Sequence, residues 1–388
     1  MVSIYHAVND GSLAVVSILF PLFRLLFHLS YTEVGIITGG GLFITLVAQL
    51  LLGRAADGKN SRILLSVGLC FTALCIALLT RSEDFITLLL FMFLLRLSTS
   101  FFHPVGVGLI SRIFKKDRLD RAMGIQSGSA DICSFIAVAT TFFLKDFAGW
   151  QFPLYLWAIA CFFIFLLGLA LTHRIPRSYV RLPMEKEKHT LREAVQIEIR
   201  FLKRIKLLVP AFMISGSAWN VMIVYFPLLL QAKTSIPLST IGLIVAVWVG
   251  VGGVASLFYG RIHEIVRNRQ TIIVVSYLAT GILSLSIIYV TFIPVLISIM
   301  ILSGIAVFLT FPVLFSFVSE ATHESAEGRT FAMTFTLQTG GGALLLFVSG
   351  VFSDLFGIWV PFAILGLASL LLTGLLLLNL KKPFVSSS

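Results

Sequence analysis

Long apolar runs separated by short polar segments are the dominant pattern along this chain. A helix that crosses the hydrocarbon core of a bilayer needs about 20 mostly apolar residues. Runs of that kind predict twelve transmembrane helices, over residues 4–28, 32–53, 63–80, 85–111, 122–144, 151–172, 207–231, 239–260, 271–290, 294–319, 330–353 and 358–380. The expected fold class is therefore an all-α membrane protein.

Composition and the placement of charge agree with this topology. Of the 388 residues, 58% are hydrophobic and only 12% are charged, about half the charged fraction of soluble domains. The segments after the even-numbered helices, including the middle segment and the C-terminus, hold 24 of the 29 Lys and Arg residues. Such an excess marks the cytoplasmic side. We expect a multi-pass protein of the cell (inner or plasma) membrane with both termini in the cytoplasm.

The net charge of +11 thus follows from topology and does not call for a nucleic-acid partner. The four cysteines fall inside predicted helices without the spacing of metal ligands. The sequence has no Walker motif, no H-E-x-x-H pair and no sizeable soluble domain. We therefore expect no enzyme activity, no metal and no cofactor. The expected partners are the lipid bilayer, a small-molecule substrate and protons, and we expect a monomer.

The longest polar segment, residues 173–206, divides the chain into two sets of six predicted helices, 1–172 and 207–388. Its second part, Thr190 to Lys206, has apolar residues at helical spacing and predicts an amphipathic helix on the membrane surface. Similar stretches recur in order in both halves, such as "DFAGWQFP" (146–153) and "DLFGIWVP" (354–361). Both halves begin on the inner side, which predicts two parallel six-helix repeats. Transporters built in this way bind substrate near the midplane, between the repeats.

The loop "GRAADGKNSR" (53–62) resembles the signature G-x-x-x-D-[RK]-x-G-[RK]-[RK] of the major facilitator superfamily. Arg96, Pro104 and "RAMG" (121–124) also stand where that superfamily has them. The resemblance implies the major facilitator fold and transport by alternating access. It also implies an ionic latch, or cytoplasmic gate, formed by Asp57, Lys59 and Arg62 in the first half and Glu264 and Arg267 in the second. Plain solvated loop charges are the alternative for this set.

Within the superfamily, the pattern H-x-x-N-D-x10-P in the first span and "FHP" (102–104) in the fourth resemble the fosmidomycin resistance protein branch of drug exporters. His6, Asn9, Asp10 and His103 are among the residues that carry this match. The resemblance implies proton-coupled drug efflux by antiport, and drug resistance. The fifth span lacks the glycine series of drug–proton antiporters, which leaves uptake open as an alternative.

Four ionisable groups inside the predicted spans are candidates for proton coupling: Asp10, Asp131, His103 and His6. Groups of this type in membrane helices almost always face the bundle interior or a water-filled cavity. At 1.5 Å per residue, Asp10, His103 and Asp131 lie about 10–15 Å from the cytoplasmic end of their helices and share one layer. Burial disfavours the charged forms of both residue types, so each can exchange a proton near neutral pH. We expect Asp10 and Asp131 to exchange protons and the histidines to modulate them.

Further polar side chains in the spans are candidates for lining the substrate cavity: Asn9, Ser17, Arg96, Ser100, Gln126, Ser127, Asn220 and Gln338. Arg96 can anchor an anionic substrate group or form a structural pair with Asp131. For the serines the alternative is a hydrogen-bonded seam between helices. The glycine triplet 340–342 favours close helix packing or bending over direct binding.

The sequence as a whole predicts a secondary active transporter, with proton-coupled export of a small amphiphilic or anionic compound as the leading function. Proton symport or facilitated uptake of a small metabolite, and lipid flipping, remain as alternatives.

Overall fold

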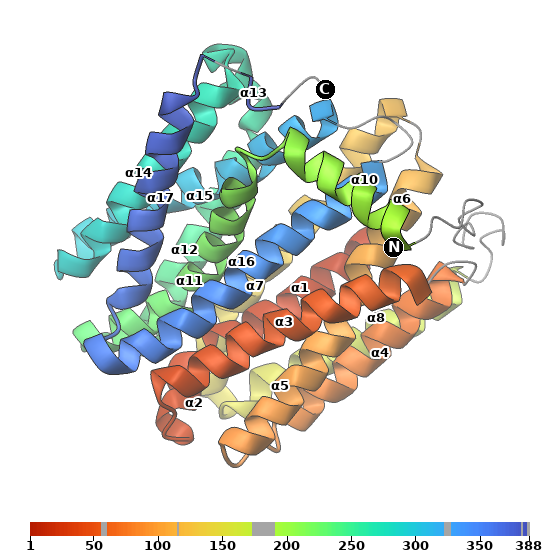
Figure 1. The fold of residues 1–388 in the computed structure, drawn as a ribbon. Helices are drawn as coiled ribbons and strands as arrows, with labels where there is room; N and C mark the ends of the chain where they lie inside the picture. Colours follow the sequence, from red (N-terminus) through yellow and green to blue (C-terminus); the bar gives the residue numbers. More distant parts are fainter. Residues whose placement is uncertain (56–59, 115, 173–190, 322–326, 382, 386–388) are drawn as a thin grey trace. The chain divides into compact units, whose positions relative to one another are not determined.

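The computed structural model of the chain describes residues 1–55, 60–114, 116–172, 191–321, 327–381 and 383–385. Within these ranges the regular elements are helices, and no β-strand occurs. Eleven helices are long and apolar enough to cross a membrane, and a bent pair at the N-terminus raises the number of candidate spans to twelve. The prediction of an all-α protein with twelve spans is confirmed (Figure 1).

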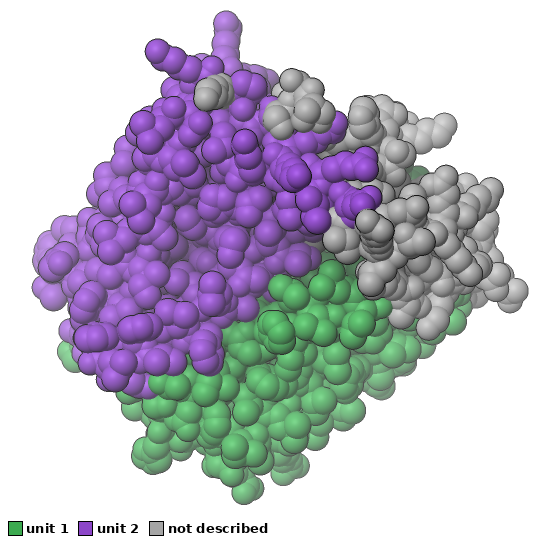
Figure 2. All heavy atoms as spheres, in the orientation of Figure 1, with its two compact units in different colours: residues 1–186, 235–246 green, residues 187–234, 247–388 purple. Residues whose placement is uncertain are grey.

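The chain divides into two compact units, which Figure 2 shows in different colours. Unit 1 comprises residues 1–186 and 235–246, and unit 2 comprises residues 187–234 and 247–388. The first part of the eighth predicted span thus groups with unit 1. The predicted bundle limits, 1–172 and 207–388, stay a prediction from the sequence.

The helices of unit 1 follow the first six apolar runs, with breaks inside two of them. They are α1 (Val2–Ile18), α2 (Phe20–Leu26), α3 (Tyr31–Ala55), α4 (Ser61–Leu79), α5 (Phe85–Thr99), the π-helical turn η1 (His103–Val107), α6 (Gly108–Ile113), α7 (Lys116–Ala148) and α8 (Gln151–Thr172).

The first predicted span is a broken helix. Helices α1 and α2 meet at Leu19 and are bent by 46° relative to each other. Pro21 has no backbone N–H, so the carbonyl of Ser17 loses its regular helical donor. The amide of Leu19 instead donates to the carbonyl of Val16, 3.1 Å away, which closes a tighter turn. The span predicted over 4–28 therefore exists as two helical segments.

The fourth predicted span also changes its winding. Helix α5 begins with a capping box, in which the Asp84 carboxylate accepts from the Thr87 backbone amide at 2.8 Å. The chain then leaves the α-helix after Thr99 and forms η1, which begins at His103 and contains Pro104. Single π-helical turns of this kind often occur at functional sites. The span predicted over 85–111 thus carries an irregular turn at its candidate histidine.

Helix α1 is the central element of unit 1, because it packs against α7, α8 and α4. Its residues Val15, Val16 and Ile18 are fully buried. The absence of a side chain at Gly11 makes room for the ring of Trp157 on α8, since a Cβ there would lie 2.4 Å from that ring. The polar residues at the start of α1 therefore stand on a helix that other helices surround.

Unit 2 contains the remaining helices, and α12 begins in unit 1. They are α10 (Leu191–Arg204), α11 (Val209–Lys233), α12 (Leu238–Leu257), α13 (Tyr259–Val266), α14 (Arg269–Tyr289), α15 (Ile293–Ala321), α16 (Glu327–Phe356) and α17 (Val360–Leu378). Helix α10 occupies the place of the amphipathic helix predicted over Thr190 to Lys206. Helices α14 and α17 pack side by side (Figure 1).

Glycines bring α11 and α16 into direct backbone contact. A Cβ on Gly341 would lie 2.4 Å from the carbonyl oxygen of Met213, and one on Gly216 would lie 2.1 Å from that of Gln338. Both neighbours are backbone atoms, which cannot move aside as a side chain can. For Gly341 the structure supports the packing interpretation of the glycine triplet.

This contact predicts that Gly341→Ala destabilises the protein by about 1–3 kcal/mol, the usual cost of overpacking a close contact. The measurement is the melting temperature of the purified protein in detergent. Gly374→Ala is the matched control, because a Cβ at Gly374 meets no atom within 4 Å and Ala favours a helix over Gly. Its melting temperature is expected to stay the same or rise slightly. Equal melting temperatures for the two variants would contradict the close approach.

Candidate functional site

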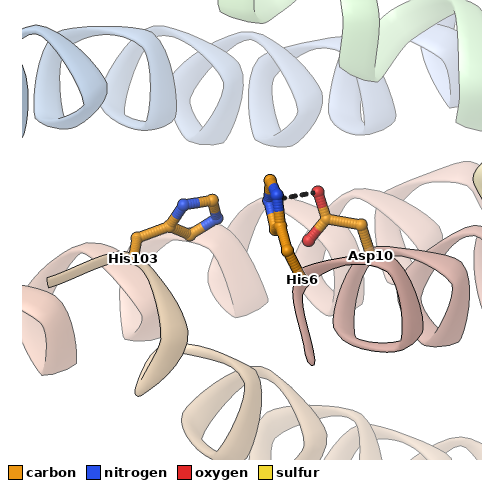
Figure 3. A group of neighbouring side chains, drawn as sticks. All are labelled: His6, Asp10 and His103. Carbon is orange, nitrogen blue, oxygen red and sulfur yellow. Dashed lines mark ion pairs between the residues drawn. The ribbon is translucent and has the colours of Figure 1, made fainter. Parts of the chain in front are cut away.

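Three polar residues at the start of α1 form the centre of the candidate site. Nε2 of His6 lies 3.0 Å from Oδ2 of Asp10, one helical turn further on (Figure 3). The side-chain amide of Asn9 donates to Oδ1 of Asp10, also at 3.0 Å. The His6 side chain is 8% exposed and that of Asp10 is 30% exposed. Both carboxylate oxygens thus have a partner on the same helix, while part of the carboxylate surface stays open.

The aromatic rings of Phe102 and His103 surround His6. Phe102 stacks on the imidazole of His6 with 4.4 Å between ring centroids and 6° between the planes. The ring of His103 meets the His6 ring edge-on at 5.3 Å. His103 is the first residue of η1, so the change in winding after α5 occurs where this chain segment approaches α1. Figure 3 shows the two imidazoles and the carboxylate facing one another.

Gln126 on α7 binds the other nitrogen of His6. Nδ1 of His6 lies 3.1 Å from the backbone oxygen of Gln126, and it also contacts the side-chain amide nitrogen of that residue. Gln126 is buried. Both ring nitrogens of His6 are therefore engaged, one by Asp10 on its own helix and one by α7.

The two contacts to Nδ1 require different protonation states of the imidazole. A protonated Nδ1 donates to the Gln126 backbone oxygen, whereas an unprotonated Nδ1 accepts from the side-chain NH2. When both ring nitrogens carry protons, the side chain of Gln126 has to present its oxygen instead of its nitrogen. The orientation of the Gln126 amide is thus linked to the proton content of His6.

Asp131 on α7 stands apart from this hydrogen-bonded group. It forms no hydrogen bond or ion pair with the residues that the structure describes. It lies close enough to Asp10 and His6 to interact electrostatically with both. The four predicted proton-coupling residues therefore belong to one electrostatic cluster, in which His6 and Asp10 are in direct contact.

Arg96, near the end of α5, is 6% exposed. Its aliphatic part packs on Gly41 of α3, where a Cβ would lie 2.9 Å from Cγ of Arg96. Its Nε has no hydrogen-bond partner, and Arg96 forms no ion pair with Asp131 or any other described residue. The structural pair with Asp131, one of the two alternatives, is not present in this structure. The buried guanidinium of Arg96 therefore retains an N–H donor that can form a further hydrogen bond.

The His6, Asp10 and His103 side chains are also close enough to surround one cation. Each offers one nitrogen or oxygen atom, and these atoms lie within 4.8 Å of one another. Experiments on proton binding at this site therefore need a chelator as a control.

The predicted serines of unit 1 are less closely tied to this cluster. The Ser100 hydroxyl is buried and donates to the Leu97 carbonyl of its own chain segment at 2.6 Å. Ser127 is exposed, and its hydroxyl lies 3.4 Å from Oε1 of Gln126. Ser17 is buried two turns beyond Asp10 on α1. Ser100 thus fulfils a local structural role in this structure.

The two candidates of unit 2 bind within that unit. The Asn220 amide donates to the Gly216 carbonyl on its own helix at 2.8 Å. The Gln338 amide lies 3.4 Å from Oγ of Ser215, which in turn lies 3.3 Å from Oγ1 of Thr310. Gln338, Ser215 and Thr310 are all buried. Ser215 and Thr310 were not among the predicted residues, because isolated hydroxyls in apolar helices carry no distinctive pattern.

An aromatic cluster in unit 2 was also missed from the sequence. The rings of Trp219, Trp248 and Phe308 meet pairwise, with 5.1–5.3 Å between centroids. Single aromatic residues are frequent in membrane helices, so their grouping depends on packing between helices. Trp248 and Phe308 are buried, so the cluster is part of the packing inside unit 2.

Only part of the predicted gate can be described. Asp57 and Lys59 lie outside the described residues, and Arg62 begins the first turn of α4, where its amide donates to the Asn60 side chain at 3.0 Å. Glu264 and Arg267 are exposed and form no ion pair with each other. The latch remains a prediction.

An apolar helical bundle with an ionisable cluster inside one of its spans is the architecture of a membrane transporter. The family description "Major Facilitator Superfamily" matches residues 2–346 and, in a second match, residues 208–387. The chain therefore belongs to the Major Facilitator Superfamily, whose members are transporters rather than enzymes. It is a multi-pass membrane protein with the fold of that family.

Individual relatives are more distant. The chain is 32% identical over 106 residues to the uncharacterized MFS-type transporter YfnC of Bacillus subtilis (strain 168). That match covers 27% of this chain and 26% of the length of YfnC. Among solved structures, a bacterial homologue of the human lysosomal transporter Spinster, inward-facing and occupied, is similar with a TM-score of 0.83 and 12% identity. The similarity covers 100% of this chain and 97% of the homologue.

A variant of the nucleoside transporter NupG is also similar, with a TM-score of 0.79, 13% identity and 97% of both chains covered. At these identities the two solved structures establish the fold alone.

The contact between Gln126 and His6 predicts a stability cost when the amide is removed. Gln126→Leu should destabilise the protein by about 1 kcal/mol, the typical net value of one buried hydrogen bond. The check is thermal unfolding of the purified protein in detergent. Ser127→Ala, at the exposed neighbouring position, should change stability by no more than about 0.5 kcal/mol. An equal effect of both substitutions would argue against the described role of Gln126.

Proposed function

We propose that this chain is a proton-coupled exporter of a small amphiphilic or anionic compound, working by alternating access in the cell membrane with both termini in the cytoplasm. The observation that carries the proposal is the ion pair of 3.0 Å between His6 and Asp10 on a membrane helix. An ionised group in such a helix costs at least about 2.5–3.5 kcal/mol. Transport proteins use such groups as proton relays.

The cluster can carry one proton in two arrangements. In the first, His6 is an imidazolium that pairs with an ionised Asp10, and Asp10 also accepts from Asn9. In the second, the proton is on Asp10, the unprotonated Nδ1 of His6 accepts from the side-chain NH2 of Gln126, and the amide turns accordingly. Because Gln126 belongs to α7, the position of this proton on α1 changes the contact between two helices. Asp131, within electrostatic range of both groups, is the second proton-exchanging carboxylate of the proposal.

Arg96 is proposed to bind the anionic group of the substrate. Its buried guanidinium forms no ion pair among the described residues, so an incoming carboxylate or phosphonate can supply the missing counter-charge.

The arrangement of the motif residues supports the drug-exporter branch. One sequence pattern contains His6, Asn9 and Asp10, and a second contains Phe102 and His103. His6 and Phe102 are 96 positions apart in the chain. The side chains of both patterns are in contact around the His6 ring. Residues that resemble the fosmidomycin resistance branch are therefore neighbours, which supports the proposal of export by proton antiport and a role in drug resistance.

Uptake of a small metabolite is the second candidate function. The similarity to a nucleoside transporter makes nucleosides one class of metabolite to test.

Transport is measured in proteoliposomes with a panel of phosphonates, amphiphilic cations and nucleosides. Accumulation driven by an acidic lumen supports antiport. Accumulation driven by an acidic exterior would establish symport and overturn export, and transport indifferent to pH would overturn coupling.

Asp10→Asn is expected to abolish transport driven by a pH gradient, because the amide cannot carry the exchanged proton. Substrate exchange without a gradient should persist at a measurable rate, which shows that the variant is folded. Asp146→Asn is the matched control, since Asp146 is exposed and, among the described residues, pairs with its neighbour Lys145 alone. It should keep the gradient-driven activity. All measurements are made with and without EDTA.

Gradient-driven transport that survives in Asp10→Asn would remove Asp10 from the coupling mechanism. Loss of activity on adding EDTA to the unmodified protein would show that a cation, rather than the proton, occupies the cluster.

Arg96→Gln is expected to raise the KM for anionic substrates about tenfold or more, since a charge-assisted hydrogen bond contributes about 1.5–3 kcal/mol. The KM for uncharged substrates should change much less. Arg81→Gln, an exposed position between α4 and α5, serves as the control of equal charge change. A uniform loss across charged and neutral compounds would make Arg96 a structural residue.

A further inference from the structure

A second polar site, separate from the proton cluster, lies at one end of unit 2. A pocket of about 370 Å³ opens where α13 turns into α14 and where the C-terminal segment returns to the bundle. Its polar wall consists of His263, Arg267, Asn268, Arg269 and Gln270. Among the described residues that line it, none is acidic. The described polar lining thus consists of two arginines, a histidine and two amides.

Arg267 is the most available charge of this wall. It is exposed and forms no ion pair with any residue that the structure describes, including Glu264 on the same helix. Its backbone adopts the left-handed conformation with φ of 54°, and its amide donates to the His263 carbonyl at 2.7 Å. This is the usual conformation of a helix-ending glycine. Arginine adopts this backbone conformation less readily than glycine does, but it places a charged side chain at the pocket.

The remaining lining residues of the pocket are apolar. Phe317 of α15 and Phe384 and Val385 of the C-terminal segment line it. Phe384 is only 2% exposed, and its ring packs against Phe317 with 5.9 Å between centroids. This contact fixes the C-terminal segment to the bundle. The pocket is thus lined by both basic and apolar residues.

The pocket lies at the level where membrane spans end. Arg269 is the first residue of one candidate span, Phe317 is next to the last residue of another, and Phe384 follows the end of a third. A group at this level meets the headgroup layer of a bilayer. By the distribution of Lys and Arg along the chain, this is the cytoplasmic side, where anionic lipids concentrate.

We propose that this pocket binds the phosphate-bearing headgroup of an anionic phospholipid. The guanidinium of Arg267 and the neighbouring basic and amide groups contact the phosphate, and the Phe317–Phe384 side contacts the glycerol and upper acyl region. Basic pockets between membrane helices on the cytoplasmic side are suited to such headgroups. A free phosphate compound shares the charged chemistry but makes no use of the apolar wall. The proposal does not rest on the export function, although Arg267 is also a residue of the predicted cytoplasmic gate.

The test uses the full-length protein, purified in detergent and depleted of lipid. Phosphatidylglycerol and phosphatidylcholine are added separately, and bound lipid is counted by native mass spectrometry alongside the melting temperature. We expect retention of phosphatidylglycerol and a higher melting temperature with that lipid only. Arg267→Gln should weaken binding of phosphatidylglycerol about fivefold, the effect of one basic residue near a membrane surface. Equal retention of both lipids would overturn the proposal.

Two further variants separate this site from general surface charge and from folding. Arg261→Gln removes a charge from the same helix, but Arg261 lies over the Phe258 ring and does not line the pocket. It should retain phosphatidylglycerol. Arg267→Gly suits the left-handed backbone, so it should weaken binding of phosphatidylglycerol about fivefold, as Arg267→Gln does, while keeping the melting temperature of the lipid-free protein. Weakened binding in Arg261→Gln, or unchanged binding in Arg267→Gly, would overturn the assignment.

Inorganic phosphate distinguishes the two sources of the phosphate group. It is titrated into the lipid-free protein, and we expect little stabilisation at millimolar concentrations. Strong stabilisation that Arg267→Gln abolishes, without retention of phosphatidylglycerol, would overturn the lipid assignment in favour of a soluble phosphate compound.

Discussion

The ion pair between His6 and Asp10 is the interaction on which unit 1 depends. A charge inside an apolar bundle is tolerated when it is paired and hydrogen-bonded, and removing one partner of a buried pair leaves the other charge uncompensated. Both partners of the carboxylate come from α1, whereas His6 is held by Gln126 of α7 and by the ring of Phe102. The pair therefore joins the central helix to two neighbouring segments. In this unit the candidate site is also part of the packing.

The sequence predicted where the membrane spans lie but not where they are interrupted. Apolar length fixes where a membrane helix lies, because the bilayer demands it. The bend at Leu19 and the π-helical turn at His103 each lie near a proline, which suggests the simple rule that a proline interrupts a span. Pro227 and Pro312, however, stand inside the continuous helices α11 and α15. Whether a proline interrupts a span depends on how neighbouring helices satisfy the freed carbonyl, and this is a property of packing.

The site was predictable to the extent that its contacts are local. His6 and Asp10 are four residues apart and thus share a helix face, so their contact follows from α1 alone. The approach of His103 to α1 required only the common depth predicted for Asp10, His103 and Asp131, whereas the contact of Gln126 with His6 was not predicted. The stacking of Phe102 on His6 and the lack of a pair between Arg96 and Asp131 depend on side-chain geometry between helices. One sequence, in which 35 phenylalanines serve mostly as apolar filling, gives no sign of either.

The contact between α11 and α16 limits how unit 2 can change shape. Gly216 and Gly341 each touch the backbone of the facing helix, with no side chain in between. If α11 slid along α16 by a single residue, Ser215 or Ser217 would take the place of Gly216 and meet main-chain atoms. Gly341 sets no such limit alone, because Gly340 and Gly342 flank it. The register between the two helices is therefore fixed by α11, and we expect this pair to move together during the transport cycle.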